Sequence, residues 1–234
     1  MLPVSGRSCL KKFQKGNKMK IKYVITDVDG VLIDRMPIYK KAFQSVVTDF
    51  GVPKKDAGKY YYDTAGTPIE KQISGILRKW KANSAEFLVD DLVIKFFKIA
   101  SVHPHPPLFI GVKKTVKKLK GLGKFLCATS GSKTAELEEL FKRNSLQYDV
   151  ILGSDKIPKG DEHIKFFARH FHIPKNKFCA KALYLGDGPQ DMRIASANKV
   201  MEVGITNTVS AEKLLKAGAK KIIRNIEEVL EFME

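Results

Sequence analysis

The sequence predicts an α/β protein: a doubly wound parallel sheet of the Rossmann-like kind, interrupted by an inserted all-helical domain. Short apolar runs rich in β-branched residues recur along the chain and are typical of buried parallel strands. After residue 110 these runs alternate with segments of helical periodicity, which favours a parallel sheet with helices on both faces. Between residues 36 and 100 the pattern is helical throughout, so this stretch is expected to be the insertion.

The expected core consists of residues 20–35 and 107–234, and the insertion of residues 36–106. The helices of the insertion are predicted over Ile38–Phe50, Glu70–Trp80 and Ser84–Ala100. The later strands are predicted over Phe125–Ala128, Tyr148–Leu152, Lys181–Leu185, Val200–Gly204 and Lys221–Ile223. The helices between them are predicted over Val112–Leu122, Thr134–Asn144, 161–171, Asp191–Asn198 and Ser210–Ala217. Ser132 or Thr134 is expected to cap one of these helices and Asp161 the next.

The first predicted strand ends in two carboxylates. The apolar run Tyr23–Ile25 is followed by Asp27 and Asp29, two positions apart. Residues i and i+2 of a strand project to the same side, so both carboxylates are expected to leave the strand together. They do so at the carboxyl end, where ligands of open α/β sheets bind. Crowded carboxylates there need a cation or a proton to offset their charge.

Composition limits the classes of partner. The 42 Lys and Arg residues exceed the 25 Asp and Glu residues, giving a formal net charge of +17. This excess favours anionic partners such as a phosphorylated substrate. No long basic block is interleaved with aromatic residues, so a solvated lysine-rich surface is favoured over nucleic-acid binding. No apolar run is long enough to cross a bilayer, so no membrane partner is expected.

The cysteines and the N-terminal residues bear on location. The 3 cysteines form no CxxC pair, which argues against a zinc site and fits a reducing, cytoplasmic compartment. Residues 1–19 are basic and without an apolar signal-peptide core, and are expected to be a flexible extension. Met19 is an alternative start, and an organellar transit peptide is a lesser alternative.

Polar clusters follow four of the predicted strands, at the same edge of the sheet. They are Asp27 with Asp29, Thr129 with Ser130, Lys156 or Lys159, and Asp187 with Asp191. Carboxylates that converge there suit a hard cation such as Mg²⁺, which binds carboxylates together with a substrate phosphate. A lysine and a hydroxyl would complete a phosphate clamp, and an aspartate can itself attack phosphorus to form an aspartyl phosphate.

The motifs DVDGVL at 27–32 and GDGPQD at 186–191, with the Thr–Ser strand end and the lysine between them, resemble the haloacid dehalogenase superfamily of phosphohydrolases. The resemblance extends from Lys22 to about Glu231. It implies that Asp27 is the nucleophile and that Asp29 is the general acid and base. It also implies that Asp27, the backbone carbonyl of Asp29, and Asp187 hold Mg²⁺, while Asp191 supports the metal's waters or the lysine.

The resemblance implies further roles around these aspartates. Thr129 would hydrogen-bond the transferring phosphoryl group, with Ser130 and Gly131 beside it. Lys159 would offset negative charge, although Lys156 is a rival. The insertion resembles the family's small helical cap, whose substrate-specificity loop would place Gly66 and Thr67 toward the active site. Arg35 stands where relatives often have a small polar residue, which predicts a more cationic entrance.

The expected function is that of a Mg²⁺-dependent phosphatase that hydrolyses a small phosphorylated metabolite through an aspartyl phosphate. Asp29 favours phosphate over halide chemistry, because true dehalogenases of the family need neither a second aspartate nor Mg²⁺. A sugar-phosphate phosphomutase that uses the same intermediate is the alternative. A basic nucleic-acid-binding protein on this fold is a third. The sequence sets neither the substrate nor the oligomeric state.

Overall fold

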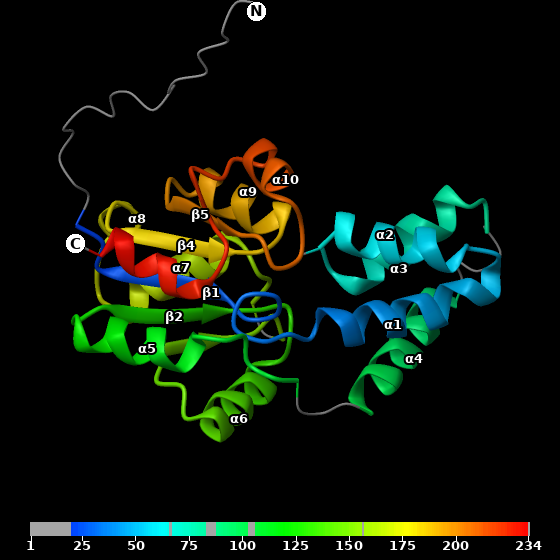
Figure 1. Cartoon of the computed structure of the whole chain (residues 1–234), viewed down its shortest axis with the longest axis horizontal. Coiled ribbons are helices and arrows are strands. Elements are labelled where there is room, and N and C mark those ends of the chain that lie inside the picture. Colours follow the sequence, from blue (N-terminus) through cyan, green and yellow to red (C-terminus); the bar gives the residue numbers. More distant parts are fainter. Residues whose placement is uncertain (1–19, 66, 83–87, 103–105, 156, 234) are drawn as a thin grey trace, which may run out of the picture.

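The computed structural model describes residues 20–65, 67–82, 88–102, 106–155 and 157–233. Among these residues, six strands form one sheet in the order β3-β2-β1-β4-β5-β6, and all neighbouring strands are parallel (Figure 1). The strands are β1 Tyr23–Asp27, β2 Phe125–Thr129, β3 Val150–Leu152, β4 Ala182–Gly186, β5 Met201–Ile205 and β6 Lys221–Ile223. The strand order reverses beside β1, and ligands of open α/β sheets bind outside such a reversal.

Alternate residues of the central strands face two separate hydrophobic clusters. Val24 pairs in register with Leu126 and Leu183, and all three belong to the cluster that α5, α6 and η3 complete. Ile25 and Tyr184 belong to the opposite cluster, which α7, α8 and α9 complete. The sheet is therefore doubly wound, as predicted. The helices are α5 Val112–Gly121, α6 Thr134–Asn144, α7 Asp161–His170, α8 Lys175–Cys179, α9 Pro189–Ala197, α10 Ala211–Lys216 and η3 Ile226–Phe232.

The chain between β1 and α5 forms a helical unit with a hydrophobic core of its own, drawn beside the sheet in Figure 1. Its described elements are α1 Met36–Val47, η1 Thr48–Phe50, α2 Lys54–Asp63, α3 Ile69–Lys79 and α4 Val89–Ser101. Phe43, Ile73 and Phe96 are among the fully buried side chains of this core. The boundaries of the inserted domain, expected at residues 36 and 106, remain a prediction.

Several element ends differ from the predicted ones. Asp155, from the loop after β3, accepts the backbone N–H of Thr134 at 2.9 Å, so neither predicted residue caps α6. Asp161 is the first residue of α7 and pairs with lysines, and Gly160 takes the N-cap position. Strand β3 is shorter than predicted and begins at Val150; directly before it, the Asp149 carboxylate accepts the N–H of Leu126 at 2.7 Å.

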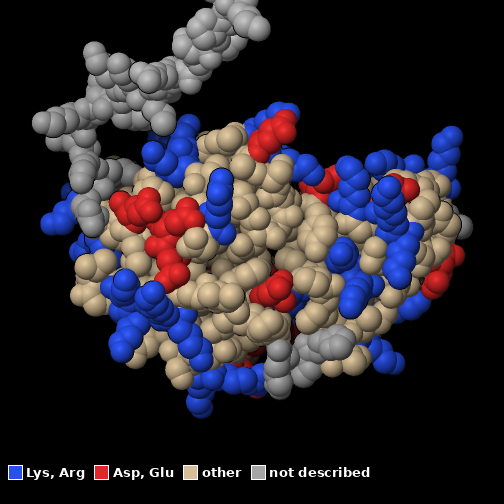
Figure 2. All heavy atoms as spheres, in the orientation of Figure 1, with Lys and Arg blue, Asp and Glu red and all other residues tan. Residues whose placement is uncertain are grey.

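Basic side chains are spread over the surface. Figure 2 shows Lys and Arg side chains over both the core and the inserted helices on the face drawn, with acidic side chains between them. Such mixing is typical of a solvated surface. No helix formed by the described residues combines the length and apolar character that a membrane span requires.

Candidate active site

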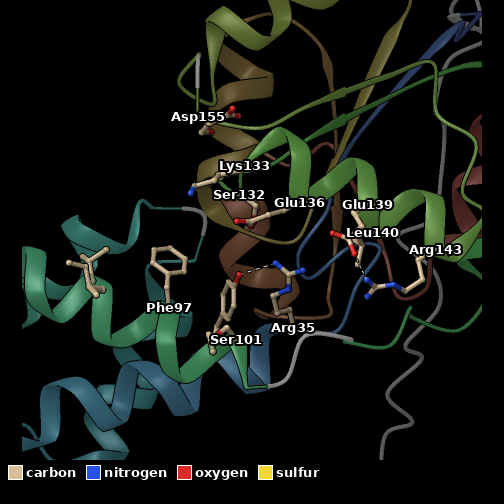
Figure 3. A pocket seen from close by; sticks show the side chains of 16 residues that line it. Arg35, Phe97, Ser101, Ser132, Lys133, Glu136, Glu139, Leu140, Arg143 and Asp155 are labelled. Carbon is tan, nitrogen blue, oxygen red and sulfur yellow. Dashed lines mark hydrogen bonds and ion pairs between the residues drawn. The ribbon is translucent and has the colours of Figure 1, made fainter.

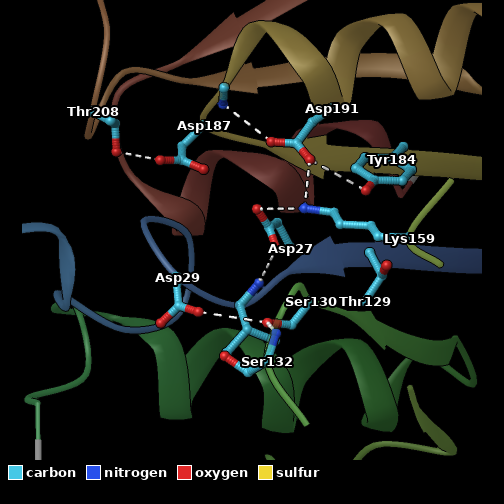
Figure 4. Close-up of polar contacts among 12 residues, drawn as sticks. Asp27, Asp29, Thr129, Ser130, Ser132, Lys159, Tyr184, Asp187, Asp191 and Thr208 are labelled. Carbon is cyan, nitrogen blue, oxygen red and sulfur yellow. Dashed lines mark hydrogen bonds and ion pairs between the residues drawn. The ribbon is translucent and has the colours of Figure 1, made fainter. Parts of the chain in front are cut away.

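Asp27 ends β1 and lies against a buried lysine. The Nζ atom of Lys159 lies 2.9 Å from Asp27 Oδ2 and 2.9 Å from Asp191 Oδ1 (Figure 4). The other oxygen of Asp27 accepts the N–H of Val28 at 2.8 Å. The Lys159 side chain is only 11% exposed, so its charge faces these carboxylates and not the solvent. Its predicted rival, Lys156, lies outside the described residues.

Three carboxylates converge at this point. Oxygen atoms of Asp27, Asp187 and Asp191 lie within 4.8 Å of one another, and all three residues are buried. Burial raises the pKa of Asp27 well above its ordinary value; Lys159 opposes this rise, and the other two carboxylates add to it. Burial and the Asp191 carboxylate raise the pKa of Asp187 to about 7. Burial opposes protonation of Lys159, but Asp191 and Asp27 raise its pKa well above the ordinary value.

The loops after β1, β4 and β5 hold these carboxylates in place. Gly188 N–H donates to Asp191 Oδ2 at 3.1 Å, and the hydroxyl of Thr208 donates to Asp187. Gly30 has a φ of +83°, and a Cβ there would lie 1.9 Å from Asp187 Oδ2. Gly30 is therefore needed for the Asp187 carboxylate to lie this close to the turn after β1.

The side chain of Asp29 lies in a different environment from that of Asp27. Its Oδ1 atom pairs with Arg35 Nε at 3.3 Å, and Ser130 Oγ donates to its Oδ2 at 3.5 Å. The carboxylate is not part of the three-carboxylate group found among the described residues. The expectation that the carboxylates of Asp27 and Asp29 leave the strand together is therefore wrong. Strand β1 ends at Asp27, so the alternation of a strand does not extend to Asp29.

Arg35 connects Asp29 to the inserted helices. Its Nη1 atom donates to the hydroxyl of Tyr39 on α1, at 2.9 Å. Burial raises the pKa of Tyr39 to about 12, and the Asp29 carboxylate adds to this rise. The predicted cationic residue is thus present at the entrance, but its charge is paired with Asp29.

The two adjacent hydroxyls at the end of β2, those of Thr129 and Ser130, have different partners. Thr129 is buried, and its Oγ1 atom lies 2.7 Å from His163 Nδ1. The other ring nitrogen, Nε2, lies 2.8 Å from the carbonyl oxygen of Ile157, to which it donates. Thr129 is then the donor to Nδ1, and the pair ties β2 to the loop that carries Lys159. The role of His163 was not predicted, because the sequence shows it only as a single histidine within an amphipathic helix.

Ser130 is the hydroxyl that lies beside Asp29. Its Oγ also accepts the N–H of Ser132 at 3.0 Å, and its carbonyl accepts the hydroxyl of Ser154 at 2.8 Å. Ser154 Oγ in turn accepts the N–H of Lys159 at 3.2 Å. A Cβ at Gly131 would meet nothing within 4 Å, so this residue lies at an open edge of the site.

The predicted specificity loop approaches the turn after β4. A Cβ at Gly188 would lie 2.9 Å from the carbonyl oxygen of Ala65. The backbone groups of Thr67 bond within the inserted unit, to Thr64 and Gln72. Gly66 lies outside the described residues.

Known proteins resemble this chain in sequence and in fold. It is 25% identical over 209 residues to the probable phosphatase IndB of Dickeya dadantii (strain 3937), covering 86% of this chain and 87% of that protein. It is 26% identical over 143 residues to hexitol phosphatase B of Escherichia coli (strain K12), covering 59% of this chain and 63% of that protein.

Two solved structures share the fold. A haloacid dehalogenase-like family hydrolase from Streptococcus pneumoniae has a TM-score of 0.76 at 20% identity, over 92% of this chain and 99% of that one. A hydrolase from Pseudomonas syringae has a TM-score of 0.72 at 18% identity, over 90% and 96%. The sequence profile of the haloacid dehalogenase-like hydrolases matches residues 24–205. The chain therefore belongs to the haloacid dehalogenase-like hydrolase family.

Proposed function

We propose that this hydrolase is a Mg²⁺-dependent phosphatase that cleaves a phosphate monoester of a small metabolite through an aspartyl phosphate on Asp27. One observation carries the proposal: Asp27 is held by Lys159 inside a carboxylate cluster, while Asp29 is held apart from it by Arg35. Two similar environments would give two equivalent carboxylates, whereas different environments allow different roles. The two relatives named as phosphatases support the same reaction class.

In the first step, a carboxylate oxygen of Asp27 attacks phosphorus, and the bond from phosphorus to the alcohol oxygen breaks. Asp29, in its protonated form, donates its proton to that oxygen. The products of this step are the free alcohol and phosphorylated Asp27.

In the second step, the carboxylate of Asp29 takes a proton from water, and the water oxygen attacks the phosphorus of the aspartyl phosphate. The bond from phosphorus to Asp27 breaks, which releases inorganic phosphate and restores both aspartates. Asp29 thus ends the cycle with the proton that it needs for the next substrate.

The geometry favours Ser130 over the predicted Thr129 as the hydroxyl that contacts the phosphoryl group. Both residues are buried, but Ser130 Oγ lies beside Asp29, whereas Thr129 Oγ1 is engaged with His163. We assign Thr129 to positioning the Lys159 loop, and we retain Gly131 as a backbone neighbour of the phosphate.

The donor set fits a hard divalent cation. Asp27, Asp187 and Asp191 offer carboxylate oxygens within 4.8 Å of one another, and one lysine cannot neutralise three carboxylates. These three residues would hold Mg²⁺, together with the backbone carbonyl of Asp29, and the ion would supply positive charge to the phosphoryl oxygens. The carboxylate of Asp29 is left for proton transfer.

Released phosphate tests the proposal. Wild-type protein with Mg²⁺ should release phosphate from a panel of phosphate monoesters, and Asp27→Asn should reduce the rate by about 10³-fold or more. Asp90→Asn, on the exposed start of α4, is the matched control and should retain the wild-type rate. Equal rates for Asp27→Asn and the wild type would refute Asp27 as the nucleophile.

The same reaction mixtures distinguish the two alternatives. A phosphomutase would convert a hexose phosphate into its positional isomer, which phosphorus NMR resolves from free phosphate. Nucleic-acid binding would require salt-sensitive association without turnover. Free phosphate as the dominant product, lost in Asp27→Asn, counts against both.

A further inference from the structure

A groove of about 810 Å³ separates the inserted helices α1 and α4 from the loop after β2 and from α6 (Figure 3). Its α4 wall is mainly apolar, with Val93, Ile94, Phe97 and Ala100 beside Ser101. Ile94 is 66% exposed and Phe97 is 49% exposed, although both are large apolar side chains. A hydrophobic wall left open beside a catalytic site is typical of a ligand-binding surface.

The groove lies next to the proposed reaction centre. Gly131 and Ser132, which directly follow Ser130, line it, and so does Arg35. Arg35 pairs with Asp29, the group that must reach the leaving oxygen of the substrate. An alcohol whose oxygen lay at Asp29 would therefore have this groove beside it.

Charges on the opposite wall limit what this alcohol can carry. Arg35, Lys133 and Arg143 line the groove, and so do Glu136 and Glu139 of α6 (Figure 3). Glu139 pairs with Arg143 at 2.6 Å. A second anionic group on the substrate would meet the Glu136 carboxylate, which is unfavourable.

We propose that the groove binds the alcohol portion of the substrate, and that this alcohol is bulky, has an apolar face such as an aromatic ring, and carries no second anionic group. The inference rests on the proposed phosphatase function and specifies its substrate class. It differs from a polyol substrate of the kind named for hexitol phosphatase B. The apolar face would pack on Ile94 and Phe97, and polar groups on the other side would face α6.

Two primary alkyl esters test the inference, because their leaving groups are similar in basicity. These are 2-(2-naphthyl)ethyl phosphate and sorbitol 6-phosphate, each assayed with Mg²⁺ for kcat and KM. We expect the wild type to favour the naphthyl ester in kcat/KM. Phe97→Ala and Ile94→Ala should each reduce the naphthyl-to-sorbitol ratio of kcat/KM, by about tenfold for Phe97, mainly through KM.

Ile110→Ala is the matched control for Ile94→Ala, because Ile110 is 94% exposed and lies outside the groove. It should leave the ratio unchanged. A second pair, hexyl phosphate and hexane-1,6-diol bisphosphate, tests the charge argument. The bisphosphate should be the poorer substrate, and Glu136→Gln should narrow the difference.

Each outcome decides a different claim. The substrate class is wrong if neither ester releases phosphate while other monoesters do. It is also wrong if the wild type prefers the sorbitol ester and the Phe97 and Ile94 variants leave the naphthyl-to-sorbitol ratio of kcat/KM unchanged. If no monoester is hydrolysed at all, the proposed function fails first. If size-exclusion chromatography shows a dimer that Phe97→Ala dissociates, a second copy of the chain occupies the groove and the inference is overturned.

Discussion

Replacing Lys159 with methionine is predicted to separate catalysis from cation binding. At an effective dielectric constant of about 20, each 2.9 Å contact from Lys159 to a carboxylate contributes about 6 kcal/mol of Coulomb attraction, and the two together about 11 kcal/mol. Three carboxylates within 4.8 Å repel one another by about 3.5 kcal/mol or more per pair, or about 10 kcal/mol in total. The attraction of the lysine is therefore about as large as the mutual repulsion of the three carboxylates.

In Lys159→Met this attraction is lost, and two buried carboxylates lose their cationic partner. The carboxylates recover part of this energy by taking up protons. The expected loss of stability is therefore about 3–5 kcal/mol, which is typical of a broken buried ion pair. For a chain of this size that corresponds to a decrease in Tm of about 6–20 °C. The phosphatase rate should decrease by about 10²- to 10³-fold, because a charge next to the transferring phosphoryl group is missing.

Thermal unfolding with and without Mg²⁺, combined with the phosphate-release assay, measures both effects. Mg²⁺ should raise the Tm of Lys159→Met at least as much as that of the wild type, because a competing cation has been removed. Lys165→Met, on the exposed side of α7, and Lys156→Met should both retain activity. A rate for Lys159→Met within threefold of the wild type, or a larger loss in Lys156→Met, would refute the assignment of Lys159.

Two further predictions follow from the same region. Saturating Mg²⁺ at about 100 times its Kd should stabilise the metal-free protein by about 2.7 kcal/mol, seen as a Tm increase of about 5–10 °C. Asp187→Asn should weaken this response, and an equal response in the variant would exclude Asp187 as a ligand. Burial lowers the pKa of His163 below its ordinary value of 6.5, with Lys159 adding to this and the Ile157 carbonyl opposing it. The unfolded chain therefore takes up a proton below about pH 6.5 while the native state does not, and stability is lost as the pH falls, by up to about 1.4 kcal/mol per pH unit. Urea unfolding of His163→Asn between pH 5 and 8 should show a flatter profile than the wild type, and parallel profiles would contradict the prediction.

The sheet could be predicted from the pattern of apolar residues along the chain, and the carboxylate cluster could be predicted from the sheet. Buried runs such as Tyr23–Ile25 mark the strands, and in a parallel sheet their carboxyl ends share one edge. Asp27 ends β1, and Asp187 and Asp191 come after β4; the two strands are neighbours, so the three carboxylates converge because of the sheet topology. Short elements were missed because their patterns are too brief to detect, as for the five-residue helix α8.

The direction of individual side chains beyond the strand ends could not be predicted. Thr129 and Ser130 are adjacent hydroxyls, and only the turn after β2 decides that the second one faces Asp29. The pairing of Arg35 with Asp29 depends on where α1 begins relative to the turn at Gly30. His163 escaped attention because its role depends on contacts with β2 and with the 157–159 loop.

The position of Arg35 links the acid–base group to the groove. Its guanidinium pairs with Asp29 through Nε and donates to Tyr39 through Nη1, and both Arg35 and Tyr39 line the groove. An alcohol that enters the groove therefore contacts the same side chains that hold Asp29 in place. In the proposed mechanism Asp29 transfers a proton to the oxygen of that alcohol. A group that packs on the apolar wall and leaves the Arg35–Asp29 pair intact would therefore place the leaving oxygen at Asp29. Specificity and proton transfer thus depend on one short segment, which joins the end of β1 to the first inserted helix.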